Sequence, residues 1–152
     1  MDRQRRRILA AASGAGIWGA LATLGFVLPR SAQAAGVFEA RTLDQAFALL
    51  GAEAPQVSDQ VVIVSNDTAE NGDAVPVGIR SLLPKSDLLA LFVDTNPNPL
   101  VACYEISEPM LPEVNMRVRM GASAKLVALV RAEGRWYRTS KEIKYISGSC
   151  GI

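Results

Sequence analysis

Short apolar segments rich in valine and isoleucine, separated by turn residues, fill most of this chain after residue 60. Such a succession is typical of β-strands, because β-branched residues pack well on a pleated sheet and Gly, Asn and Pro end each run. We expect strands over residues 61–64, 75–79, 88–93, 100–106, 115–120, 125–131 and 136–146. Six or seven strands joined by short turns predict a mainly β fold, an antiparallel β-sandwich.

One short helix is expected before the strands, over residues 42–50. Thr42 and Gln45 have the spacing of a capping box, and apolar residues follow at helical intervals. Gly51 stands where a helix ends in the left-handed conformation. The domain therefore opens with a helix of about two turns.

The turns and strands carry further signals. Asn71-Gly72 predicts a turn with positive φ, and Pro76 predicts a strand start or a sheet edge. The alternation around Arg117 and Arg119 predicts that these two side chains face solvent while Met116, Val118 and Met120 face the core. Residues 125–131 are nearly all apolar, which predicts a central strand, and Glu133-Gly134 predicts a turn.

Residues 1–34 have the pattern of a bacterial export signal. Arg5-Arg6 precede an uncharged apolar stretch over residues 8–28, as in twin-arginine leaders. Ala32 and Ala34 fit an A-x-A cleavage site, so we expect a cut after Ala34 and a periplasmic protein without a stable membrane anchor. The competing interpretation is an uncleaved membrane-spanning helix, because the stretch is just long enough to span.

Composition excludes several classes of function. The chain carries a net charge of +1, and residues 1–34 hold five arginines against one aspartate, so residues 35–152 carry a net −3 and offer no basic surplus for nucleic acid. No histidine is present, which removes Ser-His-Asp and Cys-His catalysis and imidazole metal ligands. We therefore expect no metal, no cofactor and no independent enzyme. A hydrolase using carboxylates such as Glu70 and Asp73 is the weakest alternative, because no constellation supports it.

The last residues place a cysteine close to the end of the chain. Gly148 and Ser149 precede Cys150, and Gly151 follows it, so residues 147–152 predict a flexible arm with an exposed thiol. Exposed thiols react with oxidants and sulfur species. Cys150 is therefore the candidate site for covalent attachment of a substrate that other enzymes process.

The second cysteine leaves an alternative open. Cys103 lies in the expected strand over residues 100–106, where a buried and inert thiol is common. In an exported protein with two cysteines, a Cys103–Cys150 disulfide is the default pairing. The alternative function is then an exported immunoglobulin-like binding module with a structural disulfide. Spacing alone does not decide between the two.

The chain resembles the SoxY family, the sulfur-carrying subunits of the bacterial thiosulfate-oxidation system. The resemblance rests on the order of several short motifs: the twin-arginine leader and residues 69–72, 75–77, 96–102, 117–120 and 141–144, followed directly by the terminal arm. The family arm ends in Gly-Gly-Cys-Gly-Gly. Here Gly148, Cys150 and Gly151 match that pattern, whereas Ser149 and Ile152 stand in place of glycines.

The resemblance implies both a fold and a set of partners. It implies an immunoglobulin-like sandwich over residues 35–146 that forms a heterodimer with a SoxZ-like sandwich subunit. It implies that Cys150 holds sulfur derived from a sulfur anion such as thiosulfate. A haem enzyme like SoxAX would load the cysteine, a SoxB-like enzyme would hydrolyse off sulfate, and a sulfane-dehydrogenase-like enzyme would oxidise the remaining sulfur.

Overall fold

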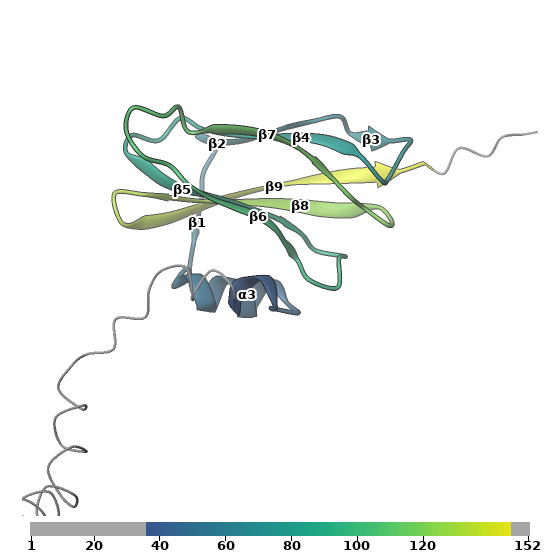
Figure 1. Ribbon diagram of the computed structural model, residues 1–152, viewed down its shortest axis with the longest axis horizontal. Helices are drawn as coiled ribbons and strands as arrows, with labels where there is room; N and C mark the ends of the chain where they lie inside the picture. Colours follow the sequence, from purple (N-terminus) through teal and green to yellow (C-terminus); the bar gives the residue numbers. More distant parts are fainter. Residues whose placement is uncertain (1–35, 147–152) are drawn as a thin grey trace, which may run out of the picture.

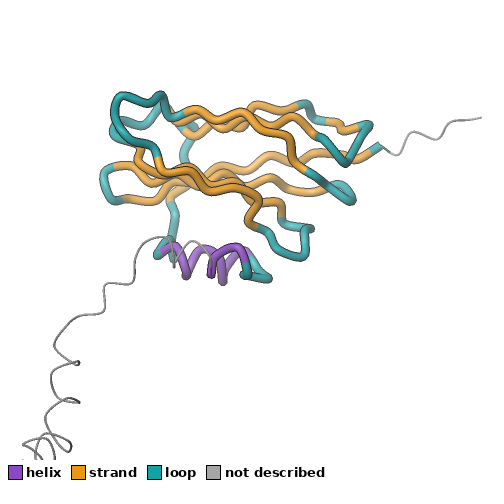
Figure 2. Tube along the Cα trace, viewed as in Figure 1, coloured by secondary structure: helices purple, strands orange, loops and turns teal. Residues whose placement is uncertain are grey.

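Two β-sheets face each other in the part of the chain that the computed structural model describes, residues 36–146 (Figure 1). The larger sheet has the order β1 (Gln56–Val57), β9 (Arg135–Tyr145), β8 (Ala124–Ala132), β5 (Ser86–Val93) and β6 (Leu100–Glu105), and β3 (Thr68–Ala69) also pairs with β9. The smaller sheet has the order β2 (Val61–Ser65), β4 (Val75–Ser81) and β7 (Glu113–Val118). The helix α3 (Leu43–Leu50) lies against the outer face of the larger sheet (Figure 2). The predicted sandwich with one short helix is confirmed.

Two short strands make the strand count and the pairing differ from the prediction. The described residues form nine strands rather than six or seven, because β1 and β3 are two-residue segments without a recognisable pattern. Both pair parallel to β9, whereas all the longer strands pair antiparallel. The predicted antiparallel sandwich is confirmed by the longer strands, and these two short segments add parallel pairs that the sequence did not indicate.

The long apolar runs of β5 and β8 follow from their position between two apolar layers. In β5, Leu89 and Leu91 join the core between the sheets, while Ala90 and Phe92 join a second core beneath α3. β8 divides its side chains between the same two cores. Because both faces of these strands are covered, neither face needs polar residues. The prediction of a central strand over residues 125–131 is confirmed, since β8 pairs with β9 on one side and β5 on the other.

The helix begins and ends where the sequence predicts. The Thr42 side chain accepts a hydrogen bond of 3.2 Å from the Gln45 backbone N–H, and Gly51 adopts φ 73° at the C-cap. The Gln45 side chain accepts from the Arg41 backbone N–H at 3.1 Å, one residue earlier than in a regular capping box. Phe47 anchors the helix to the sheet, with its ring 5.2 Å from that of Phe92 at an interplanar angle of 81°.

The turn at Asn71-Gly72 exists for a different reason from the one predicted. Among the described glycines only Gly51 and Gly134 have positive φ, so Gly72 does not supply that conformation. Instead the Asn71 side chain accepts from the Asp73 backbone N–H at 2.9 Å, and a Cβ on Gly72 would collide with the Met120 carbonyl oxygen. Gly72 is thus needed for close approach of two backbones.

The remaining local predictions agree with the structure. Arg117 and Arg119 are exposed, Val118 and Met120 are buried and Met116 is partly buried, although β7 ends at Val118. Pro76 is the second residue of β4, beyond the last residue that pairs with β2. The predicted turn at Glu133-Gly134 joins β8 to β9, and both residues have positive φ, 51° and 74°.

Candidate functional site

The candidate site is the end of β9, from which the chain continues to Cys150. The residues predicted to act in attachment and export, Gly148, Ser149, Cys150, Gly151, Arg5 and Arg6, lie outside the described residues. The structure instead describes the root of the arm, through Ile146, at one end of the sandwich (Figure 1). The geometry of that root determines from where Cys150 can act.

Three backbone amides hold the last residues of β9 in place. The pairing of β9 with β8 ends at Ile143, opposite Ala124. Beyond that point Lys144 N–H donates to the Asp67 carbonyl at 2.9 Å, and Ile146 N–H donates to the Ala69 carbonyl at 3.0 Å. Tyr145 N–H donates in the opposite direction, to the Ser123 hydroxyl at 2.9 Å.

We call these acceptors, Asp67, Ala69 and Ser123, the β9 clamp. They hold the strand beyond its last pairing with β8, because β3 pairs with Lys144 and Tyr145 along the other edge of β9 while Ser123 binds on the β8 side. The arm therefore leaves a fixed point on the sandwich, at Ile146.

An ion pair and a close backbone contact hold the loop that carries the clamp residues Asp67 and Ala69. The Lys141 ammonium lies 2.9 Å from the Asp67 carboxylate and donates to the Ser65 carbonyl at 2.5 Å. The loop after β3 is fixed where Gly72 accepts from the Met120 N–H at 2.7 Å. A side chain at Gly72 would also come within 3.2 Å of the Tyr145 ring. The loop that carries β3 is thus held at two points, by β9 and by Met120.

Sequence reasoning missed the clamp. Asp67, Thr68 and Ala69 show no strand periodicity, and Ser123 lies in a turn region rich in small residues. The one available signal was the Asn71-Gly72 turn, which predicts a tight loop but not the strand it approaches. Pairing of two residues with a distant strand is a property of the assembled fold.

Cys103 lies on β6, the outermost strand of the larger sheet, in a different part of the molecule. It is a free and partly buried thiol among the described residues and packs against the core beneath α3. Burial raises the pKa of this thiol, and the negative charge of Glu105 raises it further, against a smaller opposing effect of Arg131. At neutral pH Cys103 is therefore less ionised and less nucleophilic than an ordinary exposed cysteine.

The strand registers place Cys103 far from the root of the arm. Cys103 is opposite Ala90, which is opposite Leu129, which is opposite Arg138. Cys103 is thus level with a residue eight positions before Ile146 and three strands away from β9. With standard sheet spacings the separation is about 27 Å along the strands and about 14 Å across them, or about 30 Å in all.

The four residues from Ile146 to Cys150 are too short to span this separation. Fully extended they bridge at most about 14 Å, and a disulfide joins Cα atoms at most about 7 Å apart. The shortfall is about 9 Å. A Cys103–Cys150 bond therefore requires that β9 first release its last residues.

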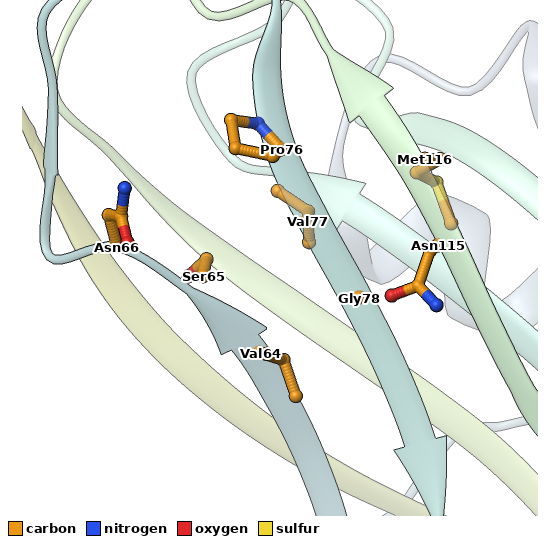
Figure 3. A pocket seen from close by; sticks show the side chains of 8 residues that line it. All are labelled: Val64, Ser65, Asn66, Pro76, Val77, Gly78, Asn115 and Met116. Carbon is orange, nitrogen blue, oxygen red and sulfur yellow. The ribbon is translucent and has the colours of Figure 1, made fainter.

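A shallow hollow lies beside the segment that leads into β3. It has a volume of about 280 Å³ at the end of β2, between β2, β4 and β7 (Figure 3). The residues that line it are Val64, Ser65, Asn66, Pro76, Val77, Gly78, Asn115 and Met116. Asn115 stands over Gly78, where a Cβ would lie 2.5 Å from the Asn115 amide oxygen. None of the lining side chains titrates near neutral pH, so the hollow offers no acid–base pair.

Residues 36–146 contain neither a cluster of metal ligands nor a helix that could span a membrane. No group of three or more Cys, Asp or Glu side chains in this part of the chain is placed to hold a metal ion. No helix in the same residues is long and apolar enough to cross a membrane.

Comparison with known proteins identifies the family. The family model described as "Sulfur oxidation protein SoxY" matches residues 46–150, a segment that ends at the candidate cysteine. The solved structure of the sulfur carrier protein SoxY from Chlorobium limicola f thiosulfatophilum is 35% identical, with a TM-score of 0.63 over 75% of this chain and 98% of that one. The chain belongs to the SoxY family. It is therefore a sulfur-carrier protein of the Sox system. Membership of this family implies partners from the same system, such as SoxZ.

A second solved structure supports the fold alone. The superoxide reductase (neelaredoxin) from Ignicoccus hospitalis is 14% identical, with a TM-score of 0.51 over 69% of this chain and 93% of that one. Comparison with curated proteins found no match. The SoxY family thus carries the functional argument, and the neelaredoxin shows that the same sandwich serves other chemistry.

Proposed function

We propose that this SoxY-family protein carries sulfur intermediates as covalent adducts of Cys150 in the periplasm. The observation that carries the proposal is the position of β9, which delivers the chain to Ile146 at the end of the sandwich, four residues before Cys150. On this proposal the chain beyond Ile146 presents the Cys150 thiol to a separate enzyme. The match to the family model also extends to residue 150.

The chemistry of the two cysteines favours the same residue. The chain has two cysteines, and Cys103 is partly buried with a raised pKa, which makes it a slow nucleophile. With no histidine in the chain, neither thiol has an imidazole base to activate it. A cysteine that enzymes load and unload fits this composition better than a catalytic cysteine does.

Thiosulfate would be bound and processed on Cys150 in successive steps. The Cys150 thiolate and thiosulfate form an S–S bond and release two electrons, which a haem partner like SoxAX accepts. Water then cleaves the terminal S–S bond of the adduct in a SoxB-like enzyme. This releases sulfate and two protons and leaves a persulfide on Cys150. A sulfane-dehydrogenase-like enzyme would oxidise the remaining sulfur.

Partner and location complete the proposal. A SoxZ-like sandwich subunit is the expected heterodimer partner, as family membership implies. The predicted twin-arginine leader with Arg5 and Arg6 supports export to the periplasm, where the substrate anions are available. Fractionation of cells, with the chain detected in the periplasmic fraction and its N-terminus sequenced, tests both export and cleavage after Ala34.

The competing binding module with a Cys103–Cys150 disulfide is opposed by the strand registers. The intact β9 leaves such a bond about 9 Å short. The carrier is therefore the function that the geometry supports best.

The deciding experiment is intact mass spectrometry of the protein isolated without reductant from cells growing on thiosulfate. We expect a reducible added mass on Cys150 that disappears in Cys150→Ser and persists in the matched variant Cys103→Ser. An adduct that persists in Cys150→Ser would contradict the proposal. So would a chain that is two hydrogens lighter in the wild type and of normal mass in both variants.

A further inference from the structure

The chain has two cysteines, and the end of β9 sets the point from which the chain runs on to Cys150. An export pathway delivers proteins to an oxidising compartment, where two cysteines in one small domain usually pair. Pairing would remove the thiol on which a carrier depends. The feature that bears on this pairing is the set of contacts at the end of β9.

The feature is the β9 clamp formed by Asp67, Ala69 and Ser123. It fixes Lys144, Tyr145 and Ile146, three residues beyond the last pairing with β8. If the clamp opens, the free segment begins after Ile143, and seven residues instead of four lead to Cys150. The clamp therefore sets the length of chain available to the carrier thiol.

The change in length decides whether the two cysteines can meet. From Ile143, Cys103 is about 17 Å along the strands and about 14 Å across them, about 22 Å in all. Seven extended residues and a disulfide bridge up to about 31 Å. With the clamp closed, the chain and the disulfide together are about 9 Å shorter than the separation they must bridge. With the clamp open, they are about 9 Å longer than that separation.

We propose that the β9 clamp is a positioning device that limits the reach of the C-terminal arm and thereby keeps Cys150 from forming a disulfide with Cys103. Ser123 is a positioning residue because its hydroxyl accepts from the Tyr145 N–H. Asp67 is one because its carboxylate binds Lys141 and so holds in place the backbone carbonyl that accepts from the Lys144 N–H. The proposal concerns the distance between two thiols, so it stands or falls independently of the sulfur compound that Cys150 carries.

The clamp is accessible to mutation without damage to the core. The Asp67 carboxylate is largely exposed, and Ser123 is exposed as well. Exposed hydrogen bonds and ion pairs each contribute little to the stability of the fold. Asp67→Asn combined with Ser123→Ala should therefore raise the open population about tenfold and leave the sandwich folded.

The test is oxidation of the reduced full-length chain by oxidised glutathione. The two protein thiols lose two protons and two electrons through a mixed disulfide, and glutathione disulfide is reduced to two glutathione thiols. We expect the Asp67→Asn/Ser123→Ala variant to form the Cys103–Cys150 bond about tenfold faster than wild type, seen as the loss of two hydrogens and as a linked peptide. Hydrogen exchange at the amides of residues 144–146 should accelerate by a similar factor.

A matched control removes similar groups at the other end of the sandwich. Ser107 donates to Met110, and Glu133 forms an exposed ion pair with Lys85 at 3.6 Å, so Ser107→Ala/Glu133→Gln loses one hydroxyl and one ion pair far from the clamp. This control should oxidise at the wild-type rate.

Three results would overturn the proposal. The wild type could form the bond as fast as the clamp variant, which would show that the clamp does not limit reach. The variant could exchange its amides faster yet form no additional bond, which would show that reach is not what keeps the thiols apart. Unchanged exchange at residues 144–146 in the variant would show that Asp67 and Ser123 do not hold the root.

Discussion

Replacement of Phe47 with Ala tests how firmly α3 is attached to the larger sheet. Phe47 is 6% exposed and makes an edge-to-face contact with Phe92. Loss of a buried phenyl ring typically costs about 3–5 kcal/mol from the lost transfer free energy and the cavity that remains. Because alanine is the best helix former, the helix itself is not weakened, and the cost measures packing alone.

We expect the free energy of unfolding of Phe47→Ala to fall by about 3–4 kcal/mol, near the lower end of that range because a helix on the surface can settle into part of the cavity. For a domain of this size the midpoint of thermal unfolding should fall by roughly 12–16 °C. Urea denaturation followed by circular dichroism gives the free energy, and its slope shows whether the native state remains compact.

Leu49→Ala on the same helix is the matched control. Leu49 is 50% exposed, so its loss should cost less than about 1 kcal/mol. If Phe47→Ala costs no more than Leu49→Ala, then α3 does not depend on the core beneath it, and the assignment of a second core there is refuted.

Three further predictions follow from local geometry. Gly134→Ala, at φ 74° in the β8–β9 turn, should lower the free energy of unfolding by about 1 kcal/mol, as measured by urea denaturation, and an unchanged stability would contradict the strain argument. In a variant without the other cysteine, the alkylation rate of Cys103 should be low at pH 7 and rise to a plateau at a pH above that of an ordinary thiol, because burial raises its pKa. The pKa of the Glu113 carboxyl is lowered chiefly by its hydrogen bond with Arg80. The contribution of this carboxylate to stability is therefore present above the ordinary glutamate pKa and is lost as the pH falls through the lowered value. An NMR titration should show the low midpoint, and Arg80→Gln should raise it, whereas an unchanged midpoint in that variant would contradict the role of Arg80.

The parts of the fold that the sequence predicted are those with local causes. Thr42, Gln45 and Gly51 mark the helix because capping groups act on backbone atoms a few residues away. The apolar run of β8 predicted a central strand because a strand covered on both faces needs no polar side chains. Each of these signals can be evaluated without knowing the partner strand.

The parts that the sequence did not predict depend on contacts between distant segments. β1 and β3 are strands only because β9 lies beside them. Gly72 was assigned to a turn with positive φ, whereas the approach of the Met120 carbonyl is what excludes a side chain there. Likewise the spacing of Cys103 and Cys150 in the sequence could not decide whether they pair. The registers of β6, β5, β8 and β9 were needed to obtain the distance from Cys103 to Ile146.

The two short parallel strands beside β9 also bear on how copies of this protein behave toward one another. β9 has eleven residues, and without β1 and β3 its whole outer edge would present unpaired N–H and C=O groups, a template on which a strand from another molecule can add. β1 covers the edge at Tyr137 and Arg138, and β3 covers it at Lys144 and Tyr145. Between them Lys141 adds a charge, held by Asp67 and Ser65. The protein is thereby guarded against edge-to-edge aggregation along its longest strand.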